Sequence, residues 1–154
     1  RALVLGPKLL VCDEAVAALD GTVRRQVLEL LAREQRDTGL SIVFISHDLA
    51  VVRTISHRVL VMYMGRLVES ADGRVLFTSP RHPYTQALLD SIPVPDPVVA
   101  PRGAVLRGEV PSLQNPPAGC VFNPRCPPAA GICSDKVPAL RNVGGSRVAC
   151  HFAE

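Results

Sequence analysis

The uneven distribution of proline constrains the fold of this chain more than any other feature of its sequence. Of the 14 prolines in 154 residues, only Pro7 precedes Pro80. Proline lacks a backbone donor and fixes φ, so a proline-dense segment is poor in helices and central strands. The chain therefore divides by composition near Ser79-Pro80 into two predicted domains, residues 1–79 and 80–154. From Pro93, PVPDPVVAP predicts a stiff, extended linker followed by little regular structure.

Charge and hydrophobicity exclude two classes of protein. The net charge of +3 comes with no basic block, and aromatic residues make up only 4% of the chain. A phosphate-tracking patch or a base-stacking platform is therefore not expected, which excludes nucleic acid as a partner. No apolar run approaches the roughly 18 residues that a membrane helix needs, and no signal peptide opens the chain. The start at Arg1, without an initiator Met, suggests a fragment, although a processed protein would begin in the same way.

The first region alternates short apolar runs with amphipathic segments. The apolar runs predict buried strands, and apolar residues at helical spacing predict helices between them. The expected strands are 9–13, 41–46 and 57–63, the last with a hairpin partner at 66–69, and the expected helices are 21–37, 48–55 and 82–92. On the first helix, Val23, Val27, Leu30 and Leu31 are expected to face the core. This order predicts an α/β fold around a parallel sheet.

The most specific chemistry of the first region lies at the ends of its first two strands. LLVCDEAVAALD, residues 9–20, leads an apolar strand into the adjacent acids Asp13 and Glu14, and SIVFISHD leads the second strand into His47. Ligands of parallel α/β sheets bind beyond the carboxyl ends of the strands. If the two strands are neighbours, two carboxylates and a histidine converge, which fits phosphoryl transfer with Mg²⁺. Each piece alone has an ordinary structural explanation, so it is the joint pattern that indicates function.

The sequence resembles the ATPase subunits of ABC transporters. PKLLVCDEAVAALD is similar to their Walker B and D-loop segment, and IVFISHDLAVVRTISHRVLVMYMGRLVE is similar to the switch-histidine strand and the strands after it. DEAVAALD together with SPRHPYTQALLDSIP resembles the oligopeptide/dipeptide importer branch. The resemblance covers nearly the whole chain. It implies the C-terminal part of a P-loop ATPase domain in residues 1–79 and a proline- and cysteine-rich irregular extension in residues 80–154.

The resemblance also implies roles for single residues. Asp13 would act on Mg²⁺ through water, and Glu14 would be the general base or the water-orienting carboxylate. His47 would contact the γ-phosphate of ATP, and Asp20 would belong to the loop that meets the partner ATPase subunit. Ala17 stands where the family more often has Ser, which is a mild departure.

A larger departure concerns the phosphate-binding half of the site. The sequence contains neither a GxxxxGK[ST] phosphate loop nor the glycine-rich signature stretch. The backbone amides and the lysine that cradle phosphates are therefore missing. We expect that this chain alone neither binds ATP tightly nor hydrolyses it, because it carries half of a catalytic site.

The second region contains four of the five cysteines, with the spacing C-x5-C-x6-C-x16-C over Cys120, Cys126, Cys133 and Cys150. Disulfides fit poorly with an ATPase of this type, which works in the cytosol where thiols stay reduced. Structural zinc usually shows short C-x2-4-C pairs, which are absent here. An iron–sulfur cluster accepts looser spacing, although the spacing does not match ferredoxin runs. The spacing alone leaves zinc, an iron–sulfur cluster and unliganded thiols open.

The residues around these cysteines add a resemblance of their own. GEVPSLQNPPAGCVFNPRCP, with VACHF near the end, resembles the C-terminal extension of oligopeptide/dipeptide transporter ATPases. In that family the four cysteines are implicated in holding a 4Fe–4S cluster, so the resemblance implies the same ligands here, with zinc as the alternative. His151, next to Cys150, is expected to be a solvated bystander. Cys12, inside the first strand, is expected to be a small hydrophobic residue.

The function that the resemblance implies is that of an ATP-binding and ATP-hydrolysing subunit of an ABC importer for peptides. ATP and Mg²⁺ would lie between two such subunits, so the implied partners are a second ATPase subunit and membrane permease subunits. The implied location is the cytoplasmic face of the membrane, with no transmembrane segment in the chain. The alternative is a catalytically inactive remnant that acts as a metal-binding or iron–sulfur-binding interaction module.

Overall fold

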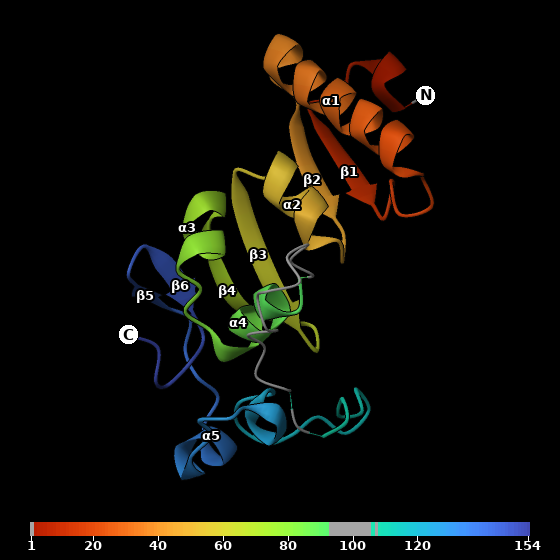
Figure 1. Ribbon diagram of the computed structural model, residues 1–154. Coiled ribbons are helices and arrows are strands. Elements are labelled where there is room, and N and C mark those ends of the chain that lie inside the picture. Colours follow the sequence, from red (N-terminus) through yellow and green to blue (C-terminus); the bar gives the residue numbers. More distant parts are fainter. Residues whose placement is uncertain (1, 93–105, 107) are drawn as a thin grey trace, which may run out of the picture. The chain divides into compact units, whose positions relative to one another are not determined.

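The computed structural model describes residues 2–92, 106 and 108–154. The chain forms two compact units, residues 1–56 and residues 57–154 (Figure 1). The predicted linker at 93–101 lies outside the described residues. Among the described residues, no helix is both long and apolar enough to cross a membrane. The compositional boundary near Ser79-Pro80 falls inside the second unit, and a division into domains at that point remains a prediction.

The first unit alternates strands and helices in the predicted order. It consists of η1 (Ala2–Leu5), β1 (Leu9–Asp13), α1 (Gly21–Thr38), β2 (Ser41–Ile45) and α2 (Leu49–Ile55). β1 and β2 are parallel neighbours, with Leu9 opposite Ser41 and Asp13 opposite Ile45. The predicted α/β architecture with a parallel sheet is therefore confirmed, and so is the condition that brings both strand ends to one edge.

Residues at both ends of α1 explain its length. The Asp20 carboxylate accepts hydrogen bonds from the amides of Thr22 (2.9 Å) and Val23 (3.0 Å), which is an N-cap. At the other end Gly39 adopts a left-handed conformation (φ 70°), and its N–H donates to the carbonyl of Gln35 at 3.1 Å. Only glycine adopts this conformation without strain, so the helix ends where the sequence predicts.

One face of the β1–β2 sheet carries the core of the first unit. The buried residues there are Val16, Leu28 and Val51, with Leu19, Val27, Phe44 and Ile55 packed against them. The expected inward face of α1 was wrong at Val23 and Leu30, which are each 39% exposed. The prediction was right at Leu31, which is buried, and at Val27, which packs against the core, and it missed Leu28, which is also buried.

The opposite face of this sheet is apolar and open. Its side chains alternate along the strands with those that face the helices, and each is about half exposed: Leu9 (55%), Val11 (58%), Val43 (48%) and Ile45 (46%). Sheets of parallel strands are normally covered on both faces. The described residues of the first unit thus leave one apolar face of their own sheet uncovered.

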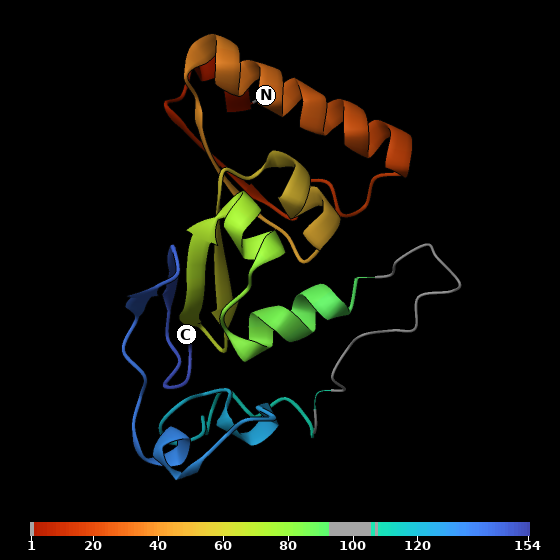
Figure 2. The same cartoon turned by 60° about the vertical axis from the view of Figure 1, so that its left-hand side comes forward.

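The second unit is built on an antiparallel sheet with the strand order β3-β4-β6-β5 (Figures 1 and 2). Its strands are β3 (Arg58–Tyr63), β4 (Arg66–Asp72), β5 (Arg141–Val143) and β6 (Ser146–Val148). Its helices are α3 (Gly73–Thr78), α4 (Pro83–Asp90), η2 (Asn123–Arg125) and α5 (Gly131–Asp135). β4 pairs with β3 along one edge and with β6 along the other. The β3–β4 hairpin and the C-terminal extension therefore share one sheet.

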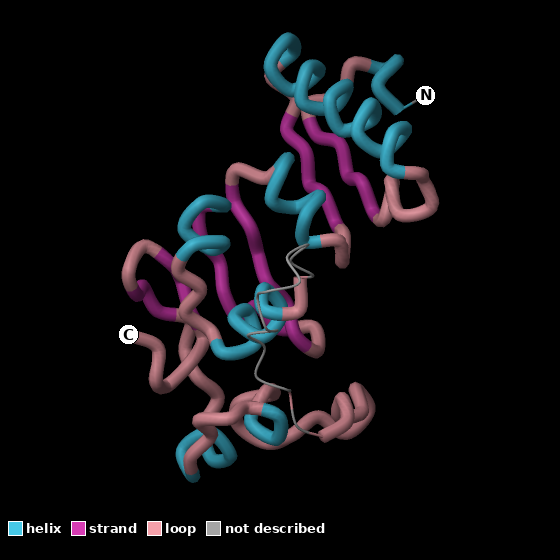
Figure 3. The backbone as a smooth tube through the Cα atoms, viewed as in Figure 1, coloured by secondary structure: helices cyan, strands magenta, loops and turns pink. Residues whose placement is uncertain are grey.

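The extension is mostly loop, as predicted, but it also contains a regular hairpin (Figure 3). β5 and β6 pair through Val143 and Ser146, across a turn in which Gly144 (φ 53°) and Gly145 (φ 84°) are both left-handed. Two adjacent glycines between β-forming residues are a recognised hairpin signal. The Gly144-Gly145 pair could therefore have predicted this hairpin, but the proline-rich composition around it favoured a prediction of irregular structure.

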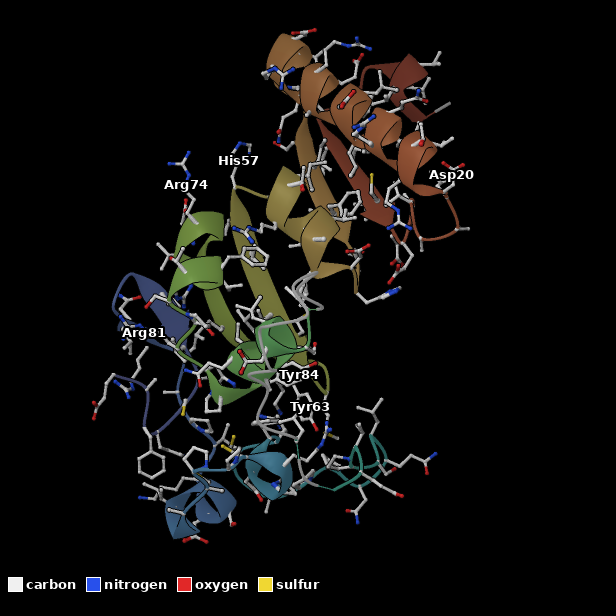
Figure 4. The ribbon with its side chains drawn as sticks, in the orientation of Figure 1. Asp20, His57, Tyr63, Arg74, Arg81 and Tyr84 are labelled. Atoms are coloured by element: carbon white, nitrogen blue, oxygen red, sulfur yellow. The ribbon has the colours of Figure 1, made fainter. Side chains whose placement is uncertain are left out.

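An aromatic cluster forms part of the core of the second unit. The rings of Tyr63 and Tyr84 are 4.7 Å apart, and Figure 4 shows the two side chains next to each other. Phe122, which is fully buried, lies 5.2 Å from Tyr63 and 5.4 Å from Tyr84. Residues of β3, of α4 and of the segment just before η2 thus meet in one packed group.

Candidate functional site

The structure brings the two predicted catalytic side chains together at the carboxyl ends of β1 and β2. Nδ1 of His47 and Oε1 of Glu14 are 2.8 Å apart. Asp13, the last residue of β1, directly precedes Glu14 in the sequence and is exposed. This edge therefore presents two carboxylates and an imidazole, as the strand ends predict.

The backbone of Glu14 departs from ordinary geometry. Its φ of 48° lies in the left-handed region, which costs a non-glycine residue free energy. The N–H of Glu14 donates to the carbonyl of Ile45 at 3.0 Å, and its carbonyl accepts from the N–H of Ala17 at 3.1 Å. Both backbone groups are thus held while the carboxylate points to His47, a combination that clusters at functional sites.

The electrostatics of the pair favour a charged imidazole. The hydrogen bond to Glu14 raises the pKa of His47 above its ordinary value of 6.5, and the negative charges of Glu14 and then Asp48 act in the same direction. Both side chains remain accessible, with 80% of His47 and 42% of Glu14 exposed. An accessible histidine that carries a proton can donate a hydrogen bond from its second nitrogen to a phosphate oxygen.

A neighbouring acid has a structural role instead. Asp48 caps α2 through Oδ1, which accepts from the amides of Ala50 (3.0 Å) and Val51 (3.2 Å). Its Oδ2 accepts from Arg24 of α1 at 2.8 Å, and Arg24 also donates to the carbonyl of Leu19 at 3.0 Å. This link through Arg24, which the sequence did not predict, fixes the loop before α1 to the loop after β2.

Asp20, predicted to face a partner subunit, is exposed, and its Oδ1 caps α1. The capping bonds explain its conformation without a partner. Its role toward a second subunit therefore remains a prediction.

The four clustered cysteines form a second group of chemical interest. None of the five cysteines, all of which the structure describes, is in a disulfide. Burial, together with the smaller effect of the nearby Cys150, Cys120 and Cys133, raises the pKa of the Cys126 thiol to about 12. Burial also raises the pKa of Cys120, with smaller contributions from Cys133 and Cys150. These mutual effects mean that the four thiols share one region.

The backbone between these thiols is tightly held. The N–H of Cys120 donates to the carbonyl of Cys133 at 2.7 Å. Gly119 adopts a left-handed conformation (φ 68°), and a side chain there would overlap the backbone carbonyl of Cys133. Arg141 donates to the carbonyls of Cys150 (3.3 Å) and Ala153 (2.7 Å). With the bond from the N–H of Cys126 to the carbonyl of Asn123 at 3.3 Å, contacts within the protein order all four cysteine-bearing segments.

The fit of this group to a metal depends on the size of the centre. Among the described residues, no three or more Cys, His, Asp or Glu side chains lie close enough to hold one metal ion. A single Zn²⁺ needs four sulfurs at about 2.3 Å from one point, whereas an iron–sulfur cubane takes more widely spaced thiolates.

His151 and Cys12, which the sequence did not place in a functional site, each have a structural environment of their own. Nε2 of His151 lies 3.0 Å from the carbonyl of Lys136, so this nitrogen is already engaged. Cys12 is buried in β1, and burial raises the pKa of its thiol, in keeping with a small hydrophobic residue.

Comparisons with known proteins agree with these observations. Residues 68–133 match the family model described as the oligopeptide/dipeptide transporter, C-terminal region. A putative peptide import ATP-binding protein of Brucella abortus is 53% identical over 99% of this chain and 45% of its own length. A probable peptide ABC transporter ATP-binding protein of Sinorhizobium fredii is 54% identical over 98% of this chain and 43% of its own length. The chain thus spans less than half the length of these relatives.

Among solved structures, cbiO1 from Clostridium perfringens, part of the ABC transporter complex cbiONQ, is 31% identical. That likeness covers 50% of this chain and 31% of cbiO1, with a TM-score of 0.47.

Proposed function

We propose, since this chain belongs to the oligopeptide/dipeptide family of ABC transporter ATP-binding subunits, that its first unit supplies the hydrolytic half of an ATPase site. The observation that carries the proposal is the contact of 2.8 Å between Glu14 and His47, at the ends of two parallel strands. The complete ATPase would power peptide import with a second ATPase subunit and membrane permease subunits, at the cytoplasmic face of the membrane.

The residues at this edge fit a bound Mg–ATP. Carboxylate oxygens are the donors that Mg²⁺ prefers, and Asp13 is an exposed carboxylate next to the reacting edge. When bound, Mg²⁺ neutralises charge on the phosphates. Asp13 would hold the metal through water, Glu14 would orient the attacking water and accept its proton, and His47 would donate a hydrogen bond to a γ-phosphate oxygen.

The open face of the β1–β2 sheet supports the same proposal. Its exposed side chains, which include Val11 and Val43, are apolar, whereas parallel sheets are normally covered on both faces. The relatives are more than twice as long as the matched segment. The part of such a protein that carries the phosphate loop would cover this face and complete the site.

A direct test compares the chain alone with a chimera that joins it to the preceding part of the Brucella abortus relative. Calorimetry should show no micromolar ATP binding by the chain alone, and the chimera should bind and hydrolyse ATP. Glu14→Gln should abolish hydrolysis in the chimera while ATP binding persists. Glu29→Gln is the matched control, because Glu29 is exposed on α1 with only a distant ion pair, 3.9 Å from Arg25. Undiminished hydrolysis by Glu14→Gln would refute the role of Glu14.

For the second unit, the convergence of four thiols favours a metal centre of the thiolate type. Cys120, Cys126, Cys133 and Cys150 would be its ligands, in the 4Fe–4S cluster that the family resemblance implies, with Zn²⁺ as the alternative. If the first unit is inactive in the complete protein, this centre would make the chain an interaction module.

Elemental analysis and paramagnetic resonance of anaerobically purified chain test this centre. Iron and sulfide should be present, and Cys126→Ser should lose both, while Cys12→Ala should retain them. A colourless protein with stoichiometric zinc would show that the four thiols bind zinc and would refute the cluster. Absence of both metals would leave the thiols without a metal and overturn the proposal.

A further inference from the structure

Glu69 of β4 is a fully buried carboxylate with two backbone partners. It is 0% exposed, and its Oε1 and Oε2 accept from the amides of Arg81 and His82, each at 2.9 Å. A buried carboxylate is tolerated only when its oxygens are well satisfied. Both oxygens are used to hold the segment that leads into α4, so Glu69 fixes where His82 lies.

His82 links that segment to the C-terminal end of the extension. It is 1% exposed, and its Nδ1 accepts from the amide of Tyr84 at 3.0 Å, which caps α4. Nε2 therefore carries the proton, and the hydrogen bond that His82 makes to the backbone of Ala149 is a donated one. The amide of Ala149 in turn donates to the carbonyl of Val68 at 2.8 Å. Ala149 is thus held by β4 on one side and by His82 on the other.

The same imidazole packs on the loop that carries two other thiols. Its ring lies 5.8 Å from that of Phe122, which is fully buried. In the sequence, Phe122 lies between Cys120 and Cys126. Ala149 directly precedes Cys150. One neutral histidine therefore contacts both the residue before the last cysteine and the loop between the first two.

We propose that Glu69 and His82 are positioning residues of the four-thiol centre. Glu69 sets the place of His82, and His82 sets Cys150 against the loop of Cys120 and Cys126. Neither side chain is itself a ligand. The inference rests on the proposed thiolate centre for its consequence, but the placement of Cys150 can be measured without any metal.

Two substitutions at one position separate the two nitrogens of His82. His82→Asn keeps an acceptor near the place of Nδ1 and loses the donor to Ala149, whereas His82→Gln keeps a donor near Nε2 and loses the cap. We expect His82→Asn to weaken iron or zinc binding about ten-fold, the lower end of the effect of removing an outer-shell partner. His82→Gln should bind metal nearly as the unchanged chain does. A merely structural role would lower the melting temperature of both variants and leave metal content per folded molecule equal.

A metal-free measurement distinguishes failure of this inference from failure of the proposed centre. Iodoacetamide labelling of the reduced apo chain, read by mass spectrometry, should modify Cys150 several-fold faster in His82→Asn than in His82→Gln. If the unchanged chain holds no metal but this difference appears, the centre fails and the positioning role stands. Equal labelling in both variants overturns the positioning role. Should His82→Asn not fold, nitrogen NMR of the unchanged chain decides, because a proton on Nδ1 of His82 would refute the bond to Ala149.

Discussion

Protonation of one buried side chain, His82, should destabilise the second unit in acid. Burial lowers the pKa of His82 from 6.5 to about 4, and the hydrogen bond to the backbone of Ala149 only partly opposes this. Between these two values the unfolded chain binds a proton that the folded chain does not. The contribution of His82 to the free energy of unfolding should therefore be highest above pH 6.5, fall as the pH drops to about 4, and then level off. The shift corresponds to a loss of about 3 kcal/mol at most, with a slope of up to about 1.4 kcal/mol per pH unit.

The chain offers a convenient probe for this experiment. It contains no Trp and two Tyr residues, Tyr63 and Tyr84, and both lie in the aromatic cluster near His82. Urea unfolding followed by tyrosine fluorescence therefore reports on this unit. Carboxylates also titrate in the same range, so the comparison is with His82→Gln, which has no imidazole to protonate. The stability difference between the two proteins should shrink as the pH falls. A difference that stays constant from pH 7 to pH 4 would refute the reasoning.

Three further perturbations address the rest of the molecule. Glu14→Gln removes the negative charge that raises the pKa of His47 and leaves only a neutral acceptor, so an NMR titration should show a lower pKa for His47; an unchanged value would mean that the pair is not formed in solution. Asp20→Ala should cost the first unit about 1 kcal/mol in chemical denaturation, whereas Asp20→Asn, which still caps α1, should cost much less; equal losses would contradict the capping role. Gly119→Ala should cost at least about 2 kcal/mol by thermal unfolding, because the added carbon overlaps a backbone carbonyl at a left-handed residue. Gly131→Ala, with open space around the added carbon, is its control.

Local sequence patterns predicted the elements that depend on neighbouring residues. The strands that end at Asp13 and Ile45, and the helix between Asp20 and Gly39, have caps and apolar runs that lie within a few residues. The meeting of Glu14 and His47 followed from one further rule, that parallel strands present their carboxyl ends at the same edge.

Contacts between distant residues could not be predicted in the same way. Glu69 is 13 residues from its partner His82, and Ala149 lies in the hairpin segment that pairs with β4. Nothing in the spacing of a glutamate in a strand distinguishes a buried acceptor of two amides from a solvated acid. Arg24 was missed for a related reason, since helical periodicity assigns it to the outer face, while Asp48 from another loop draws it inward.

The two compositional regions are joined by the pairing of β4 with β6, so the sheet of the second unit needs strands from both. β4 precedes the proline-rich region, yet its second edge is occupied by β6 from the far end of the chain. Deleting residues 80–154 would strip Glu69 of both amide partners and leave β4 as a bare edge strand, which is a template for aggregation. A shortened chain without the extension would need other side chains on β4 to fold well. The β3–β4 hairpin and the cysteine-bearing extension therefore depend on each other for their folded state.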